Sequence, residues 1–207
     1  IYLRGWLRLH RLDLDRVENW RAGGFMLGLF LIWLAIASPL SALDHEMLTA
    51  HMVQHLLLMT FAAPSILLGK PVKTLIHGMP HRLVQVMGRL FQSAGVHHVT
   101  RVLAHPAICW LGAVGTLVAW HIPAVFMLGM RSQLWHGTEQ ASFLVTGLLF
   151  WWPVVEPSRN ALQWPESSIL LYLFFATLPC DILSGFLVFC ERVVYPLYLS
   201  SPQRFGL

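Results

Sequence analysis

The stretch of residues 44–69 constrains the fold of this chain more than any other, and it reads DHEMLTAHMVQHLLLMTFAAPSILLG. It is apolar and long enough to cross a bilayer, which takes about 20 residues of α-helix. It also contains His51 and His55, which share one face because residues four apart on a helix are neighbours. Met47 and Met59 extend this row in steps of four. Polar, titratable side chains are costly inside a membrane, so the row is the first functional candidate.

Composition places the whole chain in a membrane. Hydrophobic residues make up 56% of it and charged residues only 12%, whereas about a quarter of a soluble domain is charged. Because a helix satisfies its own backbone in lipid, we expect an all-α fold, a polytopic transmembrane helix bundle. The formal charge of +4 then reports on loop orientation and gives no support for nucleic-acid binding. The three cysteines lie in apolar stretches, which favours buried thiols.

Five apolar segments have the length of a complete span, all within a single integral membrane domain at 1–207. They are residues 23–43, 45–69, 107–130, 134–155 and 167–190. Pro39 is expected to bend or end the first segment. Residues 70–105 mix basic and apolar side chains at helical spacing, which predicts an amphipathic helix on the membrane surface.

Lysine and arginine gather in residues 1–21 and 70–105, so we expect both segments on the cytoplasmic side. The acidic link at residues 44–46 should then face outward. With this orientation, polar residues of four spans reach one depth in the outer leaflet, which predicts a shared site. Imidazole and thioether groups suit copper better than magnesium or calcium. The expected metal ligands are His51, His55, His121 and His136, and the further candidates are Met47, Met52, Met59, Glu139 and Asp181.

Each candidate also has a structural interpretation. The histidines of the second span can form hydrogen bonds between helices, and His121 can bond a carbonyl that Pro123 leaves free. Methionine packs well in any core. Glu139 can hold an imidazole in place instead of binding the ion itself. Asp181 can serve a structural hydrogen bond.

Short motifs give the chain a resemblance to a known family. They are HMVQH at 51–55, WHIP at 120–123, LWHGTE and FWWP within 134–153, SPL at 38–40, AAPSILLG at 62–69 and YPLY at 195–198. With these motifs the chain resembles the CtaG-type cytochrome c oxidase assembly factors. The resemblance implies a multi-pass protein of the bacterial inner membrane that helps deliver copper to a haem–copper oxidase and is not an enzyme. We expect a nascent oxidase subunit, a periplasmic copper chaperone, membrane lipid and a second copy of the chain as partners.

The chain departs from this family pattern in two respects. Many members carry a histidine where this chain has Gln140, which would alter or weaken a site that used it. Members also usually extend beyond both ends of this sequence, so we expect about seven spans in the intact protein.

Three other functions remain open from the sequence. One is a metal-free scaffold for oxidase assembly. Another is haem binding, with His55 and His121 as axial ligands. The third is an intramembrane zinc hydrolase.

Overall fold

The structure is a computed structural model that describes residues 1–11, 19–44, 46–91, 93–155, 165–190, 192 and 194–195. Every regular element in these residues is a helix, which confirms the all-α fold class. Residues 12–18, the polar link at 156–164 and the last three residues of the YPLY motif lie outside the described part of the chain.

The first apolar segment forms α2 (Asn19–Ala37) and α3 (Pro39–Leu43), which are separated at Ser38. Ser38 has an extended backbone, and its hydroxyl accepts a hydrogen bond of 3.1 Å from the Leu40 N–H, as an N-cap does. Pro39 occupies the first helical position, where its missing N–H leaves no bond unmade. The expected end of the helix at this proline is therefore confirmed.

The second apolar segment is continuous, as α4 (Leu48–Leu56), the π-helix η1 (Leu57–Ala62) and α5 (Ala63–Leu68). At the end of the π-helix the Ala63 N–H bonds the Leu58 carbonyl, five residues back. The wider turn comes just before Pro64, which cannot donate to the helix. Gln54 fixes α4 against α2, because its buried amide donates a 3.0 Å hydrogen bond to the Ala35 carbonyl.

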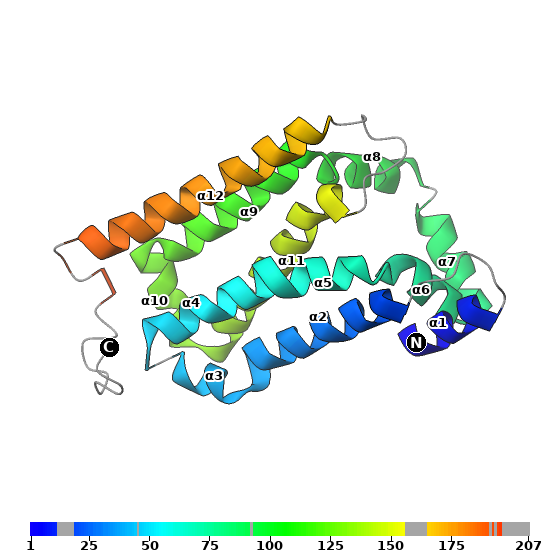
Figure 1. Cartoon of the computed structure of the whole chain (residues 1–207), viewed down its shortest axis with the longest axis horizontal. Helices are drawn as coiled ribbons and strands as arrows, with labels where there is room; N and C mark the ends of the chain where they lie inside the picture. The colour runs from blue at the N-terminus through cyan, green and yellow to red at the C-terminus, as the bar shows by residue number, and fades with distance from the viewer. Residues whose placement is uncertain are drawn as a thin grey trace.

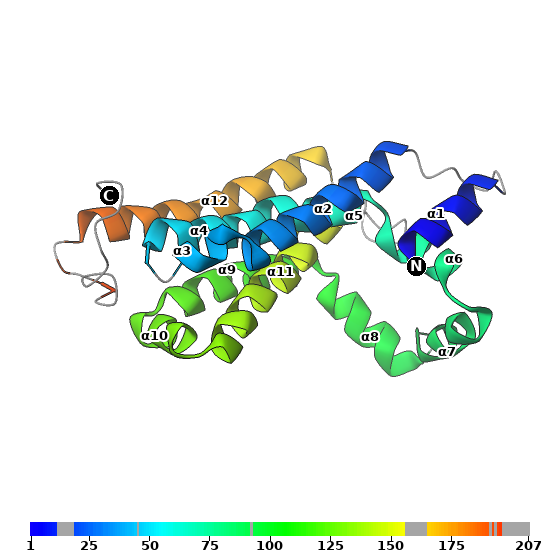
Figure 2. The same cartoon turned by 90° about the horizontal axis from the view of Figure 1, so that it is seen from below.

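Residues 70–105 form three short helices where one amphipathic helix was expected. They are α6 (Pro71–Gly78), α7 (His81–Phe91) and α8 (Ala94–Leu103). The first of them packs against α1 (Tyr2–Arg11), and a Cβ added to Gly5 would clash with the Thr74 carbonyl. Figure 2 shows α7 and α8 standing away from the layer of long helices.

The third apolar segment is broken into α9 (Pro106–His121) and α10 (Pro123–Arg131), whose axes differ by 79°. Ile122, which precedes Pro123, has an extended backbone with φ −65° and ψ 124°. A proline disfavours helical conformation in the residue before it, which accounts for the break. The sequence had predicted a single span over 107–130.

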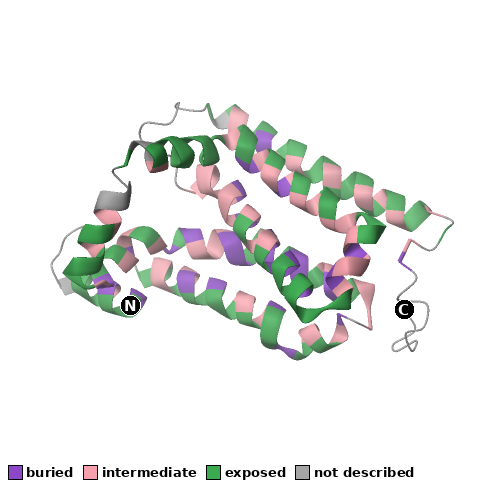
Figure 3. Cartoon of the chain, turned by 180° about the vertical axis from the view of Figure 1, so that it is seen from behind, coloured by how far each residue is buried: buried purple, intermediate pink, exposed green. Residues whose placement is uncertain are grey.

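The last two long helices are α11 (Gln133–Val155) and α12 (Glu166–Phe189). As Figure 1 shows, α12 runs beside α9, and α11 packs between α9 and α5. Ala113, Phe150 and Tyr172 form the apolar core that joins α9, α11 and α12. Figure 3 shows buried residues concentrated on the inner helices, whereas α12 is largely exposed.

Within the described residues, three helical segments are long and apolar enough to cross a membrane: Asn19–Leu43, Leu48–Leu68 and Ser167–Phe189. The bent pair α9 and α10 would make a fourth. The predicted count of five is therefore not confirmed. The long helix that is missing from this set is α11. Its first two turns carry polar residues, among them His136, Glu139 and Gln140.

Candidate metal centre

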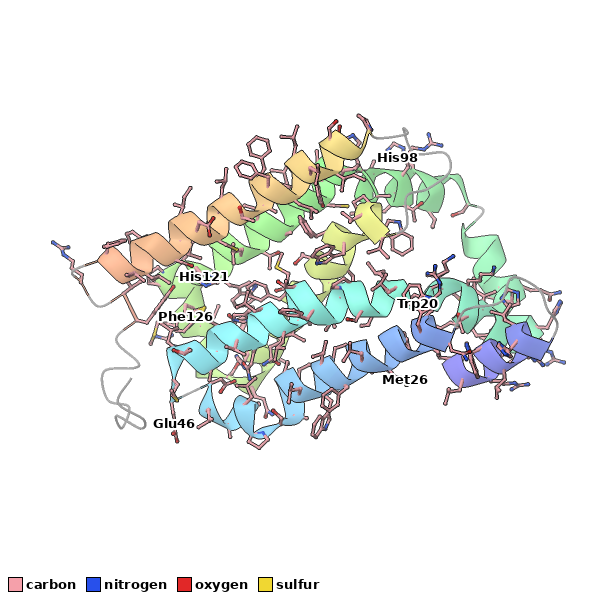
Figure 4. All side chains as sticks on the ribbon, viewed as in Figure 1. Trp20, Met26, Glu46, His98, His121 and Phe126 are labelled. Carbon is pink, nitrogen blue, oxygen red and sulfur yellow. The ribbon has the colours of Figure 1, made fainter. Side chains whose placement is uncertain are left out.

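The candidate site lies at the end of the molecule where α3 joins α4 and α10 joins α11 (Figure 1). Both α4 and α11 begin at this end and run inward, so their first turns lie side by side. Figure 4 shows His121 and Phe126 at the same end, with His98 on α8 at the other. Segments far apart in the chain thus bring imidazoles and carboxylates to one region.

The inner group consists of His51, His55 and Glu139, all of them buried. The Nε2 atoms of the two histidines lie 2.8 Å apart. The Glu139 Oε1 atom lies 3.3 Å from the Nε2 atom of His51 and 3.3 Å from that of His55. Three potential donor atoms therefore face one another across a small triangle.

The dimensions of this triangle fit a metal ion. Ligand atoms held at about 2.0 to 2.1 Å from one tetrahedral ion lie about 3.3 Å from each other. The three separations in the inner group are 2.8, 3.3 and 3.3 Å. The Nδ1 atoms of His51 and His55 are buried and have no hydrogen-bond partner among the described residues. The donor atoms that face the triangle are the Nε2 atoms and not these Nδ1 atoms.

The end group consists of Asp44, His51 and His136, which are buried and also offer ligand atoms within 4.8 Å of one another. The Asp44 Oδ2 atom lies 2.9 Å from the His136 Nε2 atom. The Glu139 Oε2 atom lies 3.4 Å from the His136 Nδ1 atom. The Glu139 carboxylate therefore joins the two groups, and His51 belongs to both.

Gln140 takes part in the end of this network. Its Nε2 atom lies 2.9 Å from the His136 Nε2 atom, and its side chain is buried. The amide therefore occupies the place on α11 where the family resemblance would put a second imidazole, one turn after His136.

His121 lies beside the inner group and belongs to neither group. Its Nδ1–H donates a 2.7 Å hydrogen bond to the Leu117 carbonyl, and its Nε2 atom lies 3.3 Å from the Met52 sulfur. The centres of the His121 and His55 rings are 6.5 Å apart. The bond at Nδ1 fixes the tautomer and directs the Nε2 lone pair toward the thioether.

Aromatic rings and a glycine enclose the inner group. Phe143 stacks on the His55 ring at 4.1 Å, and Phe126 meets the His51 ring edge-on at 5.2 Å. A Cβ added to Gly129 would stand 2.9 Å from the Glu139 Oε2 atom, so only glycine leaves that carboxylate its place. Tyr195 covers the Phe126 ring, and its hydroxyl donates a 2.9 Å hydrogen bond to the His121 carbonyl.

The other sequence candidates lie elsewhere. Met47 is the half-buried N-cap residue of α4, and Met59 packs against the apolar core of Ala113, Phe150 and Tyr172. Asp181 is exposed on α12 and belongs to neither group of potential ligands. The structure therefore does not bring the fifth segment's Asp181 together with the residues of either group.

Sequence reasoning missed Asp44 as part of the site. This residue opens the apolar stretch, where its carboxylate indicates an outward-facing link. Helical spacing gave no signal for it, because Asp44 lies in the connection between α3 and α4 and not on the helix of His51.

Comparisons with known proteins bear on the same residues. A family model described as the cytochrome c oxidase caa3 assembly factor matches residues 1–206. Two proteins, each named only as uncharacterized, from Mycobacterium bovis and Mycobacterium tuberculosis, are 25% identical over 190 residues. These alignments cover 86% of this chain, which spans about a quarter (27%) of the length of the curated relatives it matches. No solved structure matches the chain.

The family match covers every residue of the inner and end groups and all the helices that hold them. By this match the chain belongs to the cytochrome c oxidase caa3 assembly factor family.

Proposed function

We propose that this protein is a metal carrier for oxidase assembly, which binds copper at the inner group and passes it to a nascent cytochrome c oxidase subunit. Copper is the cargo, and the protein does not turn over a substrate. The observation that supports this proposal is the convergence of the His51 and His55 Nε2 atoms with the Glu139 Oε1 atom in a buried triangle. The family match supplies the oxidase connection.

The donor atoms suit a copper ion that must later leave. Imidazole is a good copper ligand, and a set without thiolate ligands favours exchange over permanent retention. Met52 lies beside His121, with its sulfur 3.3 Å from the His121 Nε2 atom. The proposed site therefore has nitrogen and oxygen donors with one thioether, that of Met52, beside it.

The distribution of charge supports an outward-facing site. Helices α1, α6, α7 and α8, whose sequences contain arginine or lysine, lie at the end of the molecule opposite the metal centre (Figure 1). Positive charge marks the cytoplasmic side of membrane proteins. In a bacterial inner membrane the site would therefore open toward the periplasm, where a copper chaperone could meet it.

A zinc hydrolase is the second candidate function. Two histidines and a glutamate, with a fourth position left open, are the ligand set of several catalytic zinc centres. The inner group offers these three ligands. In this alternative a zinc-bound water would attack an ester or amide in the membrane, so zinc-dependent cleavage of a lipid would support it.

Haem binding and a metal-free scaffold fit the contacts less well. The His55 nitrogen that haem iron would need already faces the His51 imidazole and the Glu139 carboxylate, while Phe143 covers the ring. A bare scaffold does not require two imidazole nitrogens and a carboxylate oxygen to face one another in a buried triangle.

Copper content of the purified protein tests the proposed function. We expect about one copper per wild-type chain and a fall in affinity of at least about 100-fold in the variant His51→Ala/His55→Ala, since both groups lose ligands. The matched control is His81→Ala/His98→Ala, which removes two exposed imidazoles from α7 and α8. Unchanged copper binding in the first variant would leave the metal-free scaffold as the better description.

A further inference from the structure

We infer that copper occupies two overlapping positions in turn, and that Asp44 is the ligand that receives it. The first position is the end group of Asp44, His51 and His136, and the second is the inner group of His51, His55 and Glu139. This inference rests on the proposed metal binding and adds to it a direction, a shared ligand and a further residue.

The two groups lie in order of depth. Asp44 follows α3 directly, in the connection to α4 at the end of the bundle. His55 is four residues beyond His51 on α4, which is about 6 Å further along the helix axis. Glu139 is likewise three residues beyond His136 on α11, about 4.5 Å further in the same direction. The ligands of the end group therefore come first on a path inward from the connection.

The contacts permit the ion to move by exchanging ligands one at a time. His51 belongs to both groups and can stay bound throughout. Glu139 approaches the inner histidines with Oε1 at 3.3 Å and His136 with Oε2 at 3.4 Å. As the ion moves inward, His55 and Glu139 replace Asp44 and His136. The cation is never left without ligands in a medium of low dielectric constant, which would be costly.

Because the groups share His51, they describe two positions for one ion rather than two filled sites. The carboxylate of Asp44 also provides negative charge at the point where the ion arrives, which speeds the association of a cation. Glu46 lies two residues away in the same connection and belongs to neither group. It provides a control that changes the local charge without removing a ligand.

The test uses the whole chain in detergent with Cu²⁺ as the probe, followed by stopped-flow mixing and electron paramagnetic resonance. We expect Asp44→Asn to bind one equivalent, with an association rate lower by about tenfold or more, and Asp44→Glu to recover much of the rate. Glu46→Gln should associate within about twofold of the wild-type rate, since Glu46 belongs to neither group of ligands. An Asp44→Asn variant that binds as fast as wild type, or a Glu46→Gln variant that is equally slow, would overturn the inference.

A second variant keeps the inference testable if Asp44→Asn does not fold. His55→Ala removes the inner position and leaves all three ligands of the end group. It should retain one equivalent of Cu²⁺ with a changed resonance spectrum and a dissociation rate raised about tenfold or more. Loss of all copper in His55→Ala, or two equivalents in wild type, would contradict two successive positions. Absence of copper from wild type would instead refute the proposed function, and this inference with it.

Discussion

The Nε2 atoms of His51 and His55 lie 2.8 Å apart inside the protein, on adjacent turns of one helix. In this arrangement both histidines turn the same nitrogen toward one point, and the Glu139 carboxylate of another helix completes the triangle. Both imidazoles contact the same carboxylate oxygen of a second helix, and three donor atoms that face one point are the arrangement expected around one ion.

Replacing Gly129 with alanine should weaken copper binding without changing any ligand. The new Cβ would stand 2.9 Å from the Glu139 Oε2 atom and push the carboxylate out of place. Displacement of a supporting group typically lowers metal affinity by about 10- to 100-fold. Gly137→Ala is the control, because a Cβ there meets nothing within 4 Å. Equilibrium titration with copper compares the two, and equal affinities would argue against Glu139 as a ligand.

The change Gln140→His should strengthen copper binding. Gln140 is buried with its amide 2.9 Å from the His136 Nε2 atom, so an imidazole there would add a nitrogen donor beside the end group. We expect affinity to rise by about tenfold. Gln140→Leu, which adds no donor and removes the amide, should not show this gain. If the leucine and histidine variants bind copper equally, the position does not take part in binding.

The variant Met52→Leu separates the two oxidation states of copper. The Met52 sulfur lies 3.3 Å from the His121 Nε2 atom. Thioethers favour Cu⁺. The substitution should therefore lower affinity for Cu⁺ about tenfold and leave affinity for Cu²⁺ nearly unchanged. Titrations under reducing and oxidising conditions measure both, and an equal loss for both ions would point to a packing effect.

Tyr195 should contribute to stability in a pH-dependent way. Its hydroxyl donates to the His121 carbonyl, and burial raises the pKa of Tyr195 to about 12. Because the folded pKa lies above the unfolded value of about 10, this contribution is complete below pH 10 and is lost as pH rises through 12. Tyr195→Phe should lower the free energy of unfolding by about 1 kcal/mol at neutral pH.

Thermal unfolding of both proteins between pH 7 and about pH 11 measures this difference. The gap between wild type and Tyr195→Phe should be constant up to about pH 10 and shrink above it. A gap that grows with pH would show that the hydroxyl does not hold its proton through the bond to His121.

The sequence predicted the histidine cluster because two simple quantities determine it. Helical spacing put His51 and His55 on one face, and their distance from the helix ends placed His136 at a similar depth. The same reasoning failed for Asp181, because depth does not specify direction around a helix axis. Asp181 follows Ala176, which packs on the core, by five residues and so points about 140° away from it.

The broken third segment shows a second limit of sequence reasoning. Its hydropathy predicts one span, but Pro123 also restricts Ile122 to extended backbone, and the chain turns by 79° there. This turn places α10 across the end of the bundle, where Phe126 and Gly129 enclose the site. Contacts of this kind depend on where three elements meet, which spacing within one element does not give.

Anomalous scattering at the copper absorption edge, from crystals of the copper-loaded wild-type protein, tests metal binding most directly. We predict one strong peak within about 2.2 Å of the His51 Nε2, His55 Nε2 and Glu139 Oε1 atoms. Copper found only at exposed histidines such as His98, with no peak inside the triangle, would contradict copper binding at the inner group.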